Sequence, residues 1–405
     1  MTRRRPPMAH RQAAAPSWGR PVPRIVAVGV VIGLALLVTR QLPASGGVVD
    51  PPSGRPTQAA IANAGMPSDG SGPGPTVSAG APASSSVPQS PTASPPALPP
   101  PSPQPAGRFG LGLLIADRGN GRLLVVDDAK RILWQFPRAG SLPKGQRFSA
   151  DDAFLASDGR TIVANDEAHQ VIDRIDIASG KVIWQYGHYD TLGSAAGFLH
   201  TPDDAYPLAN GDIVVADIRN CRILEINHAK RVVRHWGTAG SCSGRPPITF
   251  DNPNGDTPLA DGGLLITEIG GSRVVRLGPT GKVVFDIHVP VRYPSDAQLD
   301  AKGNVLVADY SNPGAILKVS PTGRVLWRYG PSTGPGRLDH PSLAIMLPDG
   351  TIALNDDFRS RVIVIDPRTN RIVWQYGATD RGGRSAGRLF LPDGVDLIPV
   401  GTKLS

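Results

Sequence analysis

The sequence predicts an all-β fold that is built from one repeated four-stranded unit. The unit is most complete at residues 203–237, where short runs rich in Val, Ile and Leu are separated by Gly, Asn and Asp turns. Such runs are typical of antiparallel strands that follow one another in the chain. The unit recurs six times across residues 107–405, and a four-stranded repeat of about 40–50 residues is typical of propellers. We therefore predict a six-bladed β-propeller of four-stranded blades.

The second and fourth strands align the six blades. In chain order, the second strands are LGLLIAD, TIVAND, DIVVAD, LLITE, NVLVAD and TIALND. The fourth strands are RILWQF, KVIWQY, RVVRHW, KVVFDI, RVLWRY and RIVWQY. An aromatic residue recurs at one position of this strand, except where Arg234 takes its place, and the regular spacing favours packing between blades over a cofactor stack.

The first strand is recognisable in only five of the units, as DDAFLA, DDAYPL, NGDTPL, SDAQL and SLAIML. The missing copy lies at the end of the chain, where PDGVDLIPVG at 392–401 matches PDDAYPLANG at 202–211. We predict that this C-terminal segment supplies the innermost strand of the first blade and closes the ring. Closure removes the exposed strand edges that an open meander would leave.

Three segments precede the propeller. Residues 1–24 form a basic tail, and residues 25–42 contain an uncharged run from Ile25 to Thr39. We predict that 25–42 is a transmembrane signal anchor with a cytoplasmic N-terminus, because six arginines precede the run and one follows it. A cleaved signal peptide is the alternative, since the run is short for a membrane span. Both interpretations place the propeller outside the cytoplasm.

Residues 43–106 consist mainly of Pro, Ser, Ala, Gly and Thr. Such a segment has too few apolar side chains to offset the entropy of ordering it, so we predict a disordered linker. Its prolines favour an extended, semi-rigid spacer. We interpret it as a stalk between the membrane and the propeller, and filler without a role is the alternative.

The net charge of +8 belongs to the N-terminal tail. Residues 1–40 hold seven arginines and no acid, whereas residues 107–405 hold 34 Lys and Arg against 32 Asp and Glu. A nucleic-acid-binding domain would carry a basic face on its folded part. We therefore predict no nucleic-acid partner, and the tail itself suits a membrane surface.

The chain has two cysteines, Cys221 and Cys242. Cys221 follows the second strand of the third blade, and Cys242 lies in the loop 238–252 that leads to the next blade. Loops of these two kinds lie on one face of a propeller. Outside the cytoplasm we predict a disulfide that fixes this loop, with two free thiols as the alternative; the spacing does not match a zinc site.

An acid or amide ends the second strand of each blade, and an arginine often follows five residues later. The predicted pairs are Asp117 with Arg122, Asn165 with Gln170, Asp217 with Arg222, Glu268 with Arg273, Asp309 with Gly314 and Asp356 with Arg361. Such pairs bond locally at a strand end. Because they recur around the whole ring, we interpret them as structural.

Histidines and aspartates provide the candidate site. Four histidines fall in loops on the face that carries these acids: His169, His188, His200 and His340. Asp152, Asp204, Asp296 and Asp393 begin first strands, which line the central channel of a propeller. A funnel lined by His and Asp can bind a divalent cation or perform acid–base chemistry. Capped turns and solvated loop residues are the alternative.

Parts of the sequence resemble known propeller families. GDIVVADIRNCRILEI resembles an NHL-type repeat, and GKVIWQYG and GRVLWRYG resemble quinoprotein-like (PQQ-like) repeats. HPSLAIMLPDGTIALND is similar to a phrase of bacterial arylsulfotransferases, which implies a catalytic role for His340 and also His200. The ring of aspartates resembles calcium-dependent lactonase-like propellers, which implies Ca²⁺ as a cofactor.

The features together predict a protein held in the cell membrane with its propeller outside. Our first hypothesis is a binding or scaffolding module that holds a protein or cell-surface ligand through its loops, with His169, His188, Asp152, Asp204 and Asp296 as ligand-binding residues. The alternative is an extracytoplasmic enzyme, either a metal-dependent hydrolase or a sulfotransferase, with His200 and His340 as catalytic residues. Propellers support many unrelated functions, so the fold does not decide between them.

Overall fold

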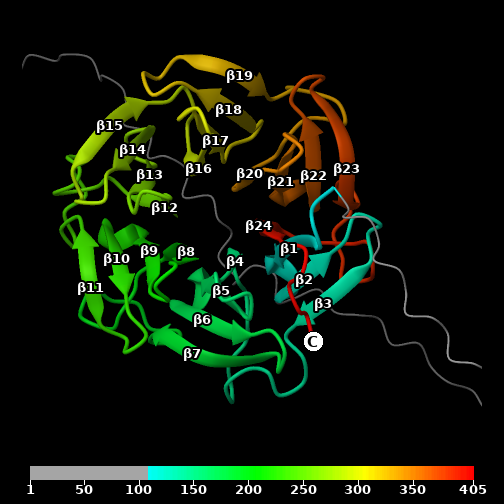
Figure 1. Cartoon of the computed structure of the whole chain (residues 1–405), viewed down its shortest axis with the longest axis horizontal. Helices are drawn as coiled ribbons and strands as arrows, with labels where there is room; N and C mark the ends of the chain where they lie inside the picture. Colours follow the sequence, from blue (N-terminus) through cyan, green and yellow to red (C-terminus); the bar gives the residue numbers. More distant parts are fainter. Residues whose placement is uncertain (1–107) are drawn as a thin grey trace, which may run out of the picture. The chain divides into compact units, whose positions relative to one another are not determined.

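The computed structural model describes residues 108–405. These residues form six four-stranded antiparallel sheets, arranged as blades around a central axis (Figure 1). Between the strands, the described part of the chain contains short 3₁₀ turns and no α-helix. The predicted all-β, six-bladed propeller is therefore confirmed.

The strands of each blade follow one another from the axis outwards. The innermost strands are β24 (Pro392–Ile398), β4 (Ala153–Leu155), β8 (Pro202–Pro207), β12 (Pro253–Pro258), β16 (Pro294–Leu299) and β20 (Ala344–Met346). The second strands are β1 (Gly112–Asp117), β5 (Thr161–Asp166), β9 (Ile213–Asp217), β13 (Leu264–Glu268), β17 (Val305–Asp309) and β21 (Ile352–Asp356).

The third and fourth strands complete the blades. The third strands are β2 (Arg122–Val126), β6 (Val171–Asp176), β10 (Arg222–Ile226), β14 (Arg273–Leu277), β18 (Ala315–Val319) and β22 (Arg361–Asp366). The outermost are β3 (Ile132–Phe136), β7 (Lys181–Gly187), β11 (Val232–Trp236), β15 (Val283–His288), β19 (Val325–Tyr329) and β23 (Arg371–Gly377). Four 3₁₀ turns follow second strands: η2 (Arg118–Asn120), η3 (Glu167–His169), η4 (Ile218–Asn220) and η5 (Asp357–Arg359).

The C-terminal strand closes the ring. The first blade has the strand order β24-β1-β2-β3, so its innermost strand comes from the end of the chain (red beside cyan in Figure 1). β24 pairs antiparallel with β1, with Leu114 opposite Asp396. This pairing confirms the closure that the match between 392–401 and 202–211 predicted.

Hydrophobic packing joins neighbouring blades. All the residues of the second strands are buried, because both faces of each sheet are covered by adjacent blades. The outer-strand tryptophans also donate hydrogen bonds to a carbonyl of the next blade: Trp134 to Ile177 at 3.1 Å, Trp184 to His228 at 2.9 Å and Trp374 to Asp128 at 2.9 Å. The regular aromatic spacing therefore reflects contact between blades.

The predicted acid–arginine pairs form at the ends of the second strands, with one correction. The Nε–Oδ2 distance is 2.6 Å for Arg122–Asp117, 2.7 Å for Arg222–Asp217 and 2.7 Å for Arg361–Asp356, and Arg273 pairs with Glu268. In the second blade the equivalent residue is Asp166 and not Asn165, since Asp166 is the last residue of β5 and pairs with the first residue of β6. Asp166 instead bonds the ring of His169.

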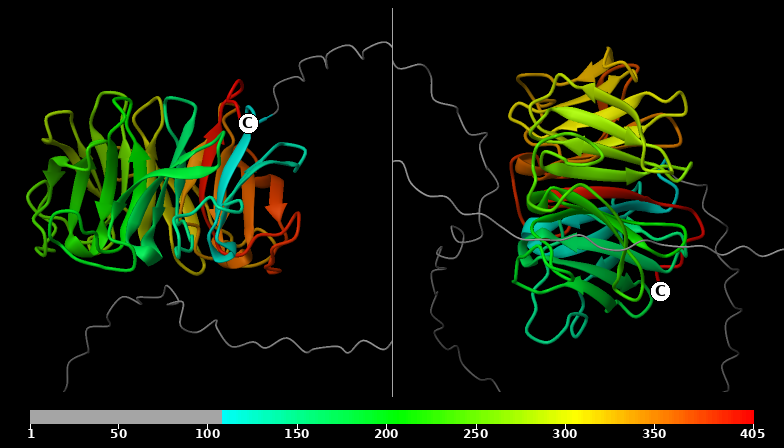
Figure 2. Two further views of the ribbon diagram at one scale, coloured as in Figure 1. Left: turned by 90° about the horizontal axis from the view of Figure 1, so that it is seen from below. Right: turned by 90° about the vertical axis from the view of Figure 1, so that its left-hand side faces the viewer.

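The two faces of the propeller differ, as the side views show (Figure 2). One face carries the connections between blades, at 137–152, 188–201, 237–252, 289–293, 330–343 and 378–391, together with the four 3₁₀ turns. We call it the mouth face. The opposite face, which we call the turn face, carries tight turns such as 156–160, 208–212 and 300–304.

The predicted basic tail (1–24), transmembrane anchor (25–42) and disordered linker (43–106) lie outside the described residues. Within 108–405, no helix has the length and apolar character that a membrane span requires.

Candidate functional site

Buried aspartates gather where the innermost strands begin, on the mouth side of the axis. They are Asp151, Asp152, Asp203, Asp204, Asp256, Asp296 and Asp393, and each side chain is less than a twentieth exposed. We call this set the axial acid cluster. It contains the predicted Asp152, Asp204 and Asp296, and it draws its members from five of the six blades.

β-bulges at the start of the innermost strands direct these side chains. In β8, Asp203 lies opposite Ala216 and Tyr206 lies opposite Val214, so that Asp204 and its neighbour together face a single residue of β9. β12 and β16 have the same irregularity at 254–255 and 295–296. Asp204 adopts a left-handed backbone with φ of 46°. A bulge changes the direction of its side chains, which lets two consecutive acids both lie near the axis.

Asp151, Asp152 and Asp203 form the tightest group in the cluster. Each offers one carboxylate oxygen, and these oxygens all lie within 4.8 Å of one another. Asn254 supports the group by donating from Nδ2 to Asp203 Oδ2 at 2.7 Å. The group therefore spans the second and third blades and is braced by the fourth.

One arginine reaches the cluster from η2. Arg118 Nη1 lies 2.6 Å from Asp151 Oδ1 and 2.6 Å from Asp393 Oδ2, while its Nη2 lies 3.0 Å from Glu167 Oε2. Its single positive charge is shared among three carboxylates. Asp152, Asp204, Asp256 and Asp296 have no ion pair among the described contacts.

Burial therefore disfavours the charged forms of these four acids and raises their pKa values. Burial raises the pKa of Asp152 well above its usual range, and the charge of Asp204 raises it further. The pKa values of Asp204 and Asp256 are raised in the same way, by burial first and then by neighbouring carboxylates. Asp296 has a pKa of about 6, because hydrogen bonds from Gln298 and Thr257 partly offset its burial.

Several carboxylate oxygens of the cluster are buried without a hydrogen-bond partner. They are Asp152 Oδ1, Asp204 Oδ2 and both oxygens of Asp256. Leaving a buried polar atom unpaired costs about 1–3 kcal/mol. Positions of this kind suit a cationic ligand.

Aromatic rings form the floor of the cluster. Phe154 and Tyr206, which follow the acids along β4 and β8, stack with their ring centroids 3.8 Å apart. The Tyr206 hydroxyl lies 3.5 Å from Asp296 Oδ1, and burial raises the pKa of that phenol. The acids thus lie between an apolar floor and the mouth face.

The predicted histidines do not gather with the acids. His169 is buried, bonds Asp166 Oδ1 through Nδ1 at 2.8 Å and stacks on Tyr189 at 4.7 Å. His188 stacks on Phe198 at 3.9 Å. The first contact joins η3 to the loop 188–201, and the second lies within that loop.

His200 and His340 occupy different positions in their blades. The backbone N–H of His200 donates to Asp217, as that of Asp339 does to Asp356. His200 is therefore the counterpart of Asp339, and His340 is one residue further along. The two histidines precede β8 and β20, which lie on opposite sides of the ring (Figure 1). The structure therefore does not bring these two histidines together.

His340 lies in an aromatic cluster on the mouth face. Its Nδ1 is 2.7 Å from Asp339 Oδ1, and its ring centroid is 4.8 Å from that of Tyr310 and 4.6 Å from that of Phe358. Tyr293 extends the cluster, with its ring 5.2 Å from Tyr310. Asp339 fixes the orientation of the imidazole and leaves Nε2 as the second functional nitrogen.

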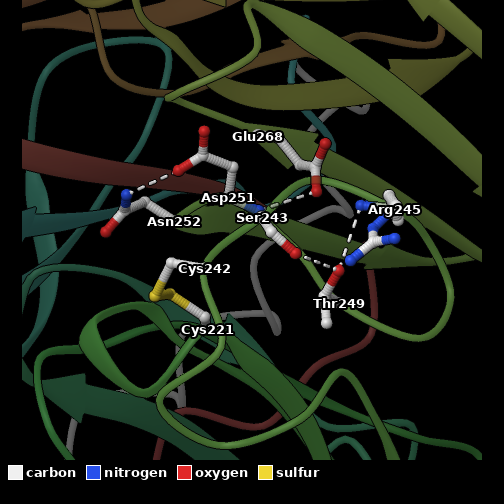
Figure 3. Close-up of a disulfide and its surroundings, with 8 residues drawn as sticks. All are labelled: Cys221, Cys242, Ser243, Arg245, Thr249, Asp251, Asn252 and Glu268. Carbon is white, nitrogen blue, oxygen red and sulfur yellow. Dashed lines mark hydrogen bonds between the residues drawn. A yellow bond between two sulfur atoms is a disulfide. The ribbon is translucent and has the colours of Figure 1, made fainter. Parts of the chain in front are cut away.

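A disulfide fixes the neighbouring loop, as Figure 3 shows. Cys221 and Cys242 are joined, with their Cα atoms 5.3 Å apart. Beyond the disulfide, the Ser243 and Thr249 hydroxyls bond at 2.9 Å, and the Asp251 N–H donates to Glu268 Oε1 at 2.9 Å. The loop 237–252 is thus fastened at both ends to the third and fourth blades.

Sequence analysis missed Asp151, Asp203, Asp256 and Arg118 as members of the site. The Asp-Asp pairs at 151–152 and 203–204 were the available signal, because strict alternation along a strand would send one member of each pair away from the axis. The bulge that brings both Asp203 and Asp204 inward carries no clear sequence mark. Arg118 sits in a turn whose equivalents in other blades are apolar or acidic.

Comparisons with known proteins agree with the fold. The family model described as outer membrane protein assembly factor BamB (PQQ_2) matches residues 230–394, which is less than half of the chain. This match confirms the similarity to PQQ-like repeats. No curated protein matches the sequence at a significant level.

Solved structures share the architecture at low sequence identity. A protein of unknown function from Bacteroides caccae is 17% identical with a TM-score of 0.50, and the match covers 70% of this chain and 97% of that one. A nidogen/laminin complex gives 14% identity and a TM-score of 0.49, covering 71% and 98%. Virginiamycin B lyase from Staphylococcus aureus gives 16% and 0.41, covering 56% and 69%. These similarities concern the fold alone.

Proposed function

We propose that this protein is a membrane-anchored, extracytoplasmic binding or scaffolding module that holds a protein partner on its mouth face. The supporting observation is the unequal distribution of exposed apolar side chains. Within residues 108–405 and outside the outermost strands, three of the four exposed large apolar residues lie on the mouth face: Leu192, Ile248 and Phe358. The fourth, Val400, lies on the turn face. Exposed apolar groups rimmed by polar residues are typical of protein-binding surfaces.

The surroundings of Phe358 add to this surface. Phe358 belongs to the aromatic cluster of His340, and the cluster lies beside Arg337, which bonds Asp339 at 3.1 Å. Aromatic and arginine side chains supply much of the binding energy at protein interfaces. The family model that matches 230–394 is, by its description, an assembly factor for outer membrane proteins, and this description agrees with a protein partner.

Site-specific photo-crosslinking in cells that make the full chain tests the proposal. A photoreactive amino acid is placed at Ile248 or Phe358 on the mouth face, and at Asn210 or Lys302 on the turn face as matched exposed controls. We expect both mouth positions to yield an adduct of the same mass, and the turn positions to yield none. Equal adducts from both faces, or none at all, would contradict the proposal.

A second candidate function is an enzyme centred on His340. The hydrogen bond from His340 to Asp339 is the arrangement by which a carboxylate orients a general base. Hydrolysis of nitrophenyl acetate and of a lactone, and sulfuryl transfer from an aryl sulfate, can be measured with the full chain and with His340→Ala. His228→Ala, which changes a turn on the opposite face, is the control. Turnover that only His340→Ala abolishes would favour the enzyme over the binding module.

A further inference from the structure

We infer that the axial acid cluster binds one hard divalent cation, with Ca²⁺ as the best-fitting ion, through Asp151, Asp152 and Asp203. This cation site is independent of the protein partner proposed above. It rests on the spacing of the three oxygens, on the unpaired buried oxygens of Asp152 and Asp204, and on the number of carboxylates that are buried together around the axis.

The spacing of the oxygens suits a single ion. Ca²⁺ binds oxygens at about 2.3–2.6 Å, so two ligands on opposite sides of one ion lie about 5 Å apart. The three carboxylate oxygens of Asp151, Asp152 and Asp203 lie within 4.8 Å of one another. One ion between them can therefore contact all three. Because the donors are carboxylate oxygens only, the site favours Ca²⁺, Mg²⁺ or Mn²⁺ over softer metals.

Two acids of the cluster, Asp152 and Asp204, each have a buried oxygen without a hydrogen-bond partner. Asp152 Oδ1 is buried with no hydrogen bond, and Asp152 as a whole is 4% exposed. Asp204 Oδ2 is in the same state beside it. Acids that served only to cap turns would have N–H donors, as Asp117 has from Phe390 at 2.7 Å.

Glycines allow these two acids to lie so close to neighbouring backbone. A Cβ at Gly394 would come within 2.7 Å of Asp152 Oδ1, and one at Gly255 within 3.1 Å of Asp204 Oδ2. In the second, third and fifth blades the equivalent position carries an aspartate of the cluster. Each of the two glycines therefore lies against an aspartate of a neighbouring blade, Gly394 against Asp152 and Gly255 against Asp204.

The charge balance favours a divalent ion. Seven carboxylates are buried around the axis, and Arg118 contacts two of them, Asp151 and Asp393, while also pairing with Glu167. Buried charges persist in proteins when they are paired or when they coordinate a metal. An ion at Asp151, Asp152 and Asp203 would offset the mutual repulsion of these groups at the point where they are closest.

The test is isothermal titration of the full chain, purified in mild detergent and treated with chelator, with CaCl₂ alone. We expect saturable binding of about one Ca²⁺ per chain, with a Kd on the order of 10⁻⁴–10⁻³ M as in extracellular modules, and a Ca²⁺-dependent rise in Tm. Asp152→Asn should weaken binding at least about tenfold and remove the rise in Tm. Asp173→Asn, which alters a buried acid of β6 away from the cluster, should bind Ca²⁺ with the affinity of the wild type and show the same rise in Tm on addition of Ca²⁺, measured from its own starting value.

A second measurement covers the case in which Asp152→Asn does not fold. Tb³⁺ luminescence, excited through the protein's aromatic residues, should appear on addition to the wild type and disappear on addition of Ca²⁺. Asp151→Asn should weaken this signal. The inference is wrong if Ca²⁺, Mg²⁺ and Mn²⁺ all fail to bind the wild type saturably, or if Asp152→Asn binds Ca²⁺ as tightly as the wild type does.

Discussion

Gly394 lies directly against Asp152: a Cβ placed on Gly394 would be 2.7 Å from Asp152 Oδ1 and 2.8 Å from Asp152 Cα. The two residues belong to the first and second blades and are far apart in the chain. Their contact shows that the ring closure by β24 and the axial acid cluster are parts of one arrangement.

Gly394→Ala should therefore destabilise the propeller. Gly394 does not adopt a positive φ, so an alanine there causes no backbone strain. The effect of the new methyl group is therefore steric. Overpacking of this kind costs about 1–3 kcal/mol, measured as the free energy of unfolding in urea. The control is Gly383→Ala, because a Cβ at Gly383 meets only ordinary contacts with the Arg388 side chain at 3.6 Å. If both variants unfold like the wild type, the packing of Gly394 against Asp152 is not as described.

Removal of β24 should abolish the cooperative unfolding of the propeller. A chain that ends at Arg388 lacks the innermost strand of the first blade and leaves β1 without its partner. Val395 and Ile398 would also be lost from the hydrophobic core. A chain that ends at Gly401 keeps β24 and serves as control. Thermal unfolding followed by circular dichroism decides the matter, and an unchanged Tm after truncation at Arg388 would refute closure by this strand.

Trp374→Phe should weaken the junction between the last and first blades. The Trp374 indole donates to the Asp128 carbonyl at 2.9 Å, and the ring packs edge-on to Phe109 at 4.9 Å. Loss of the donor and of part of the ring should reduce the free energy of unfolding by about 1–3 kcal/mol. Trp327→Phe is the comparison, since Trp327 is more exposed and bonds the Asn370 side chain. Its effect should be smaller in the same denaturant titration.

Reduction of the Cys221–Cys242 disulfide should also destabilise the protein. The cysteines are 21 residues apart, and the loop that they close corresponds to about 3 kcal/mol in the chain-entropy model. Unfolding in urea with and without reductant measures the difference. In the variant with both cysteines replaced by Ser, reductant should have no further effect. A wild type insensitive to reductant would show that the cross-link does not contribute to stability.

Asp173 should make the stability depend on pH. Burial raises its pKa from the ordinary 3.8 to about 7, although Gln185 donates to it at 2.8 Å. As pH rises above about 4, the unfolded chain loses this proton first, so the free energy of unfolding falls until about pH 7 and stays low above it. The difference corresponds to about 4 kcal/mol at most.

Asp173→Asn keeps the acceptor for Gln185 and removes the charge. It should therefore be more stable than the wild type at pH 8 and similar to it at pH 4, as measured by urea unfolding at both pH values. The charges of Asp166 and His169 also act on Asp173, so the comparison of variant with wild type isolates the contribution of Asp173. A variant less stable than the wild type at pH 8 would show that the carboxylate is not buried as described.

Local sequence patterns sufficed for most of the fold. Strand runs, turn residues and the match between 392–401 and 202–211 predicted six blades and their closure, because each blade is built from contacts between neighbours in the chain. The error at Asn165 was a shift of one residue at a strand end. Asp152, Asp204 and Asp296 were found because residues that begin innermost strands must lie near the axis.

The site depended on relationships that a single repeat does not contain. His200 and His340 both precede an innermost strand, but their positions are not equivalent. His200 is the counterpart of Asp339, so His340 is the counterpart of Thr201. Asp203 and Asp204 both reach the axis because a bulge alters the alternation of β8. Arg118 meets Asp393 across 275 positions of the chain.

By itself, then, the sequence determined the repeat, the number of blades, the strand that closes the ring and the positions of acids at the strand starts, since all of these follow from local periodicity and turn chemistry. Only the tertiary structure decided which acids meet, which oxygens are left without a partner, and which histidines stand apart from them. The physical reason is that the axis of a propeller is shared by all its blades, so distances across it depend on the closure of the whole ring.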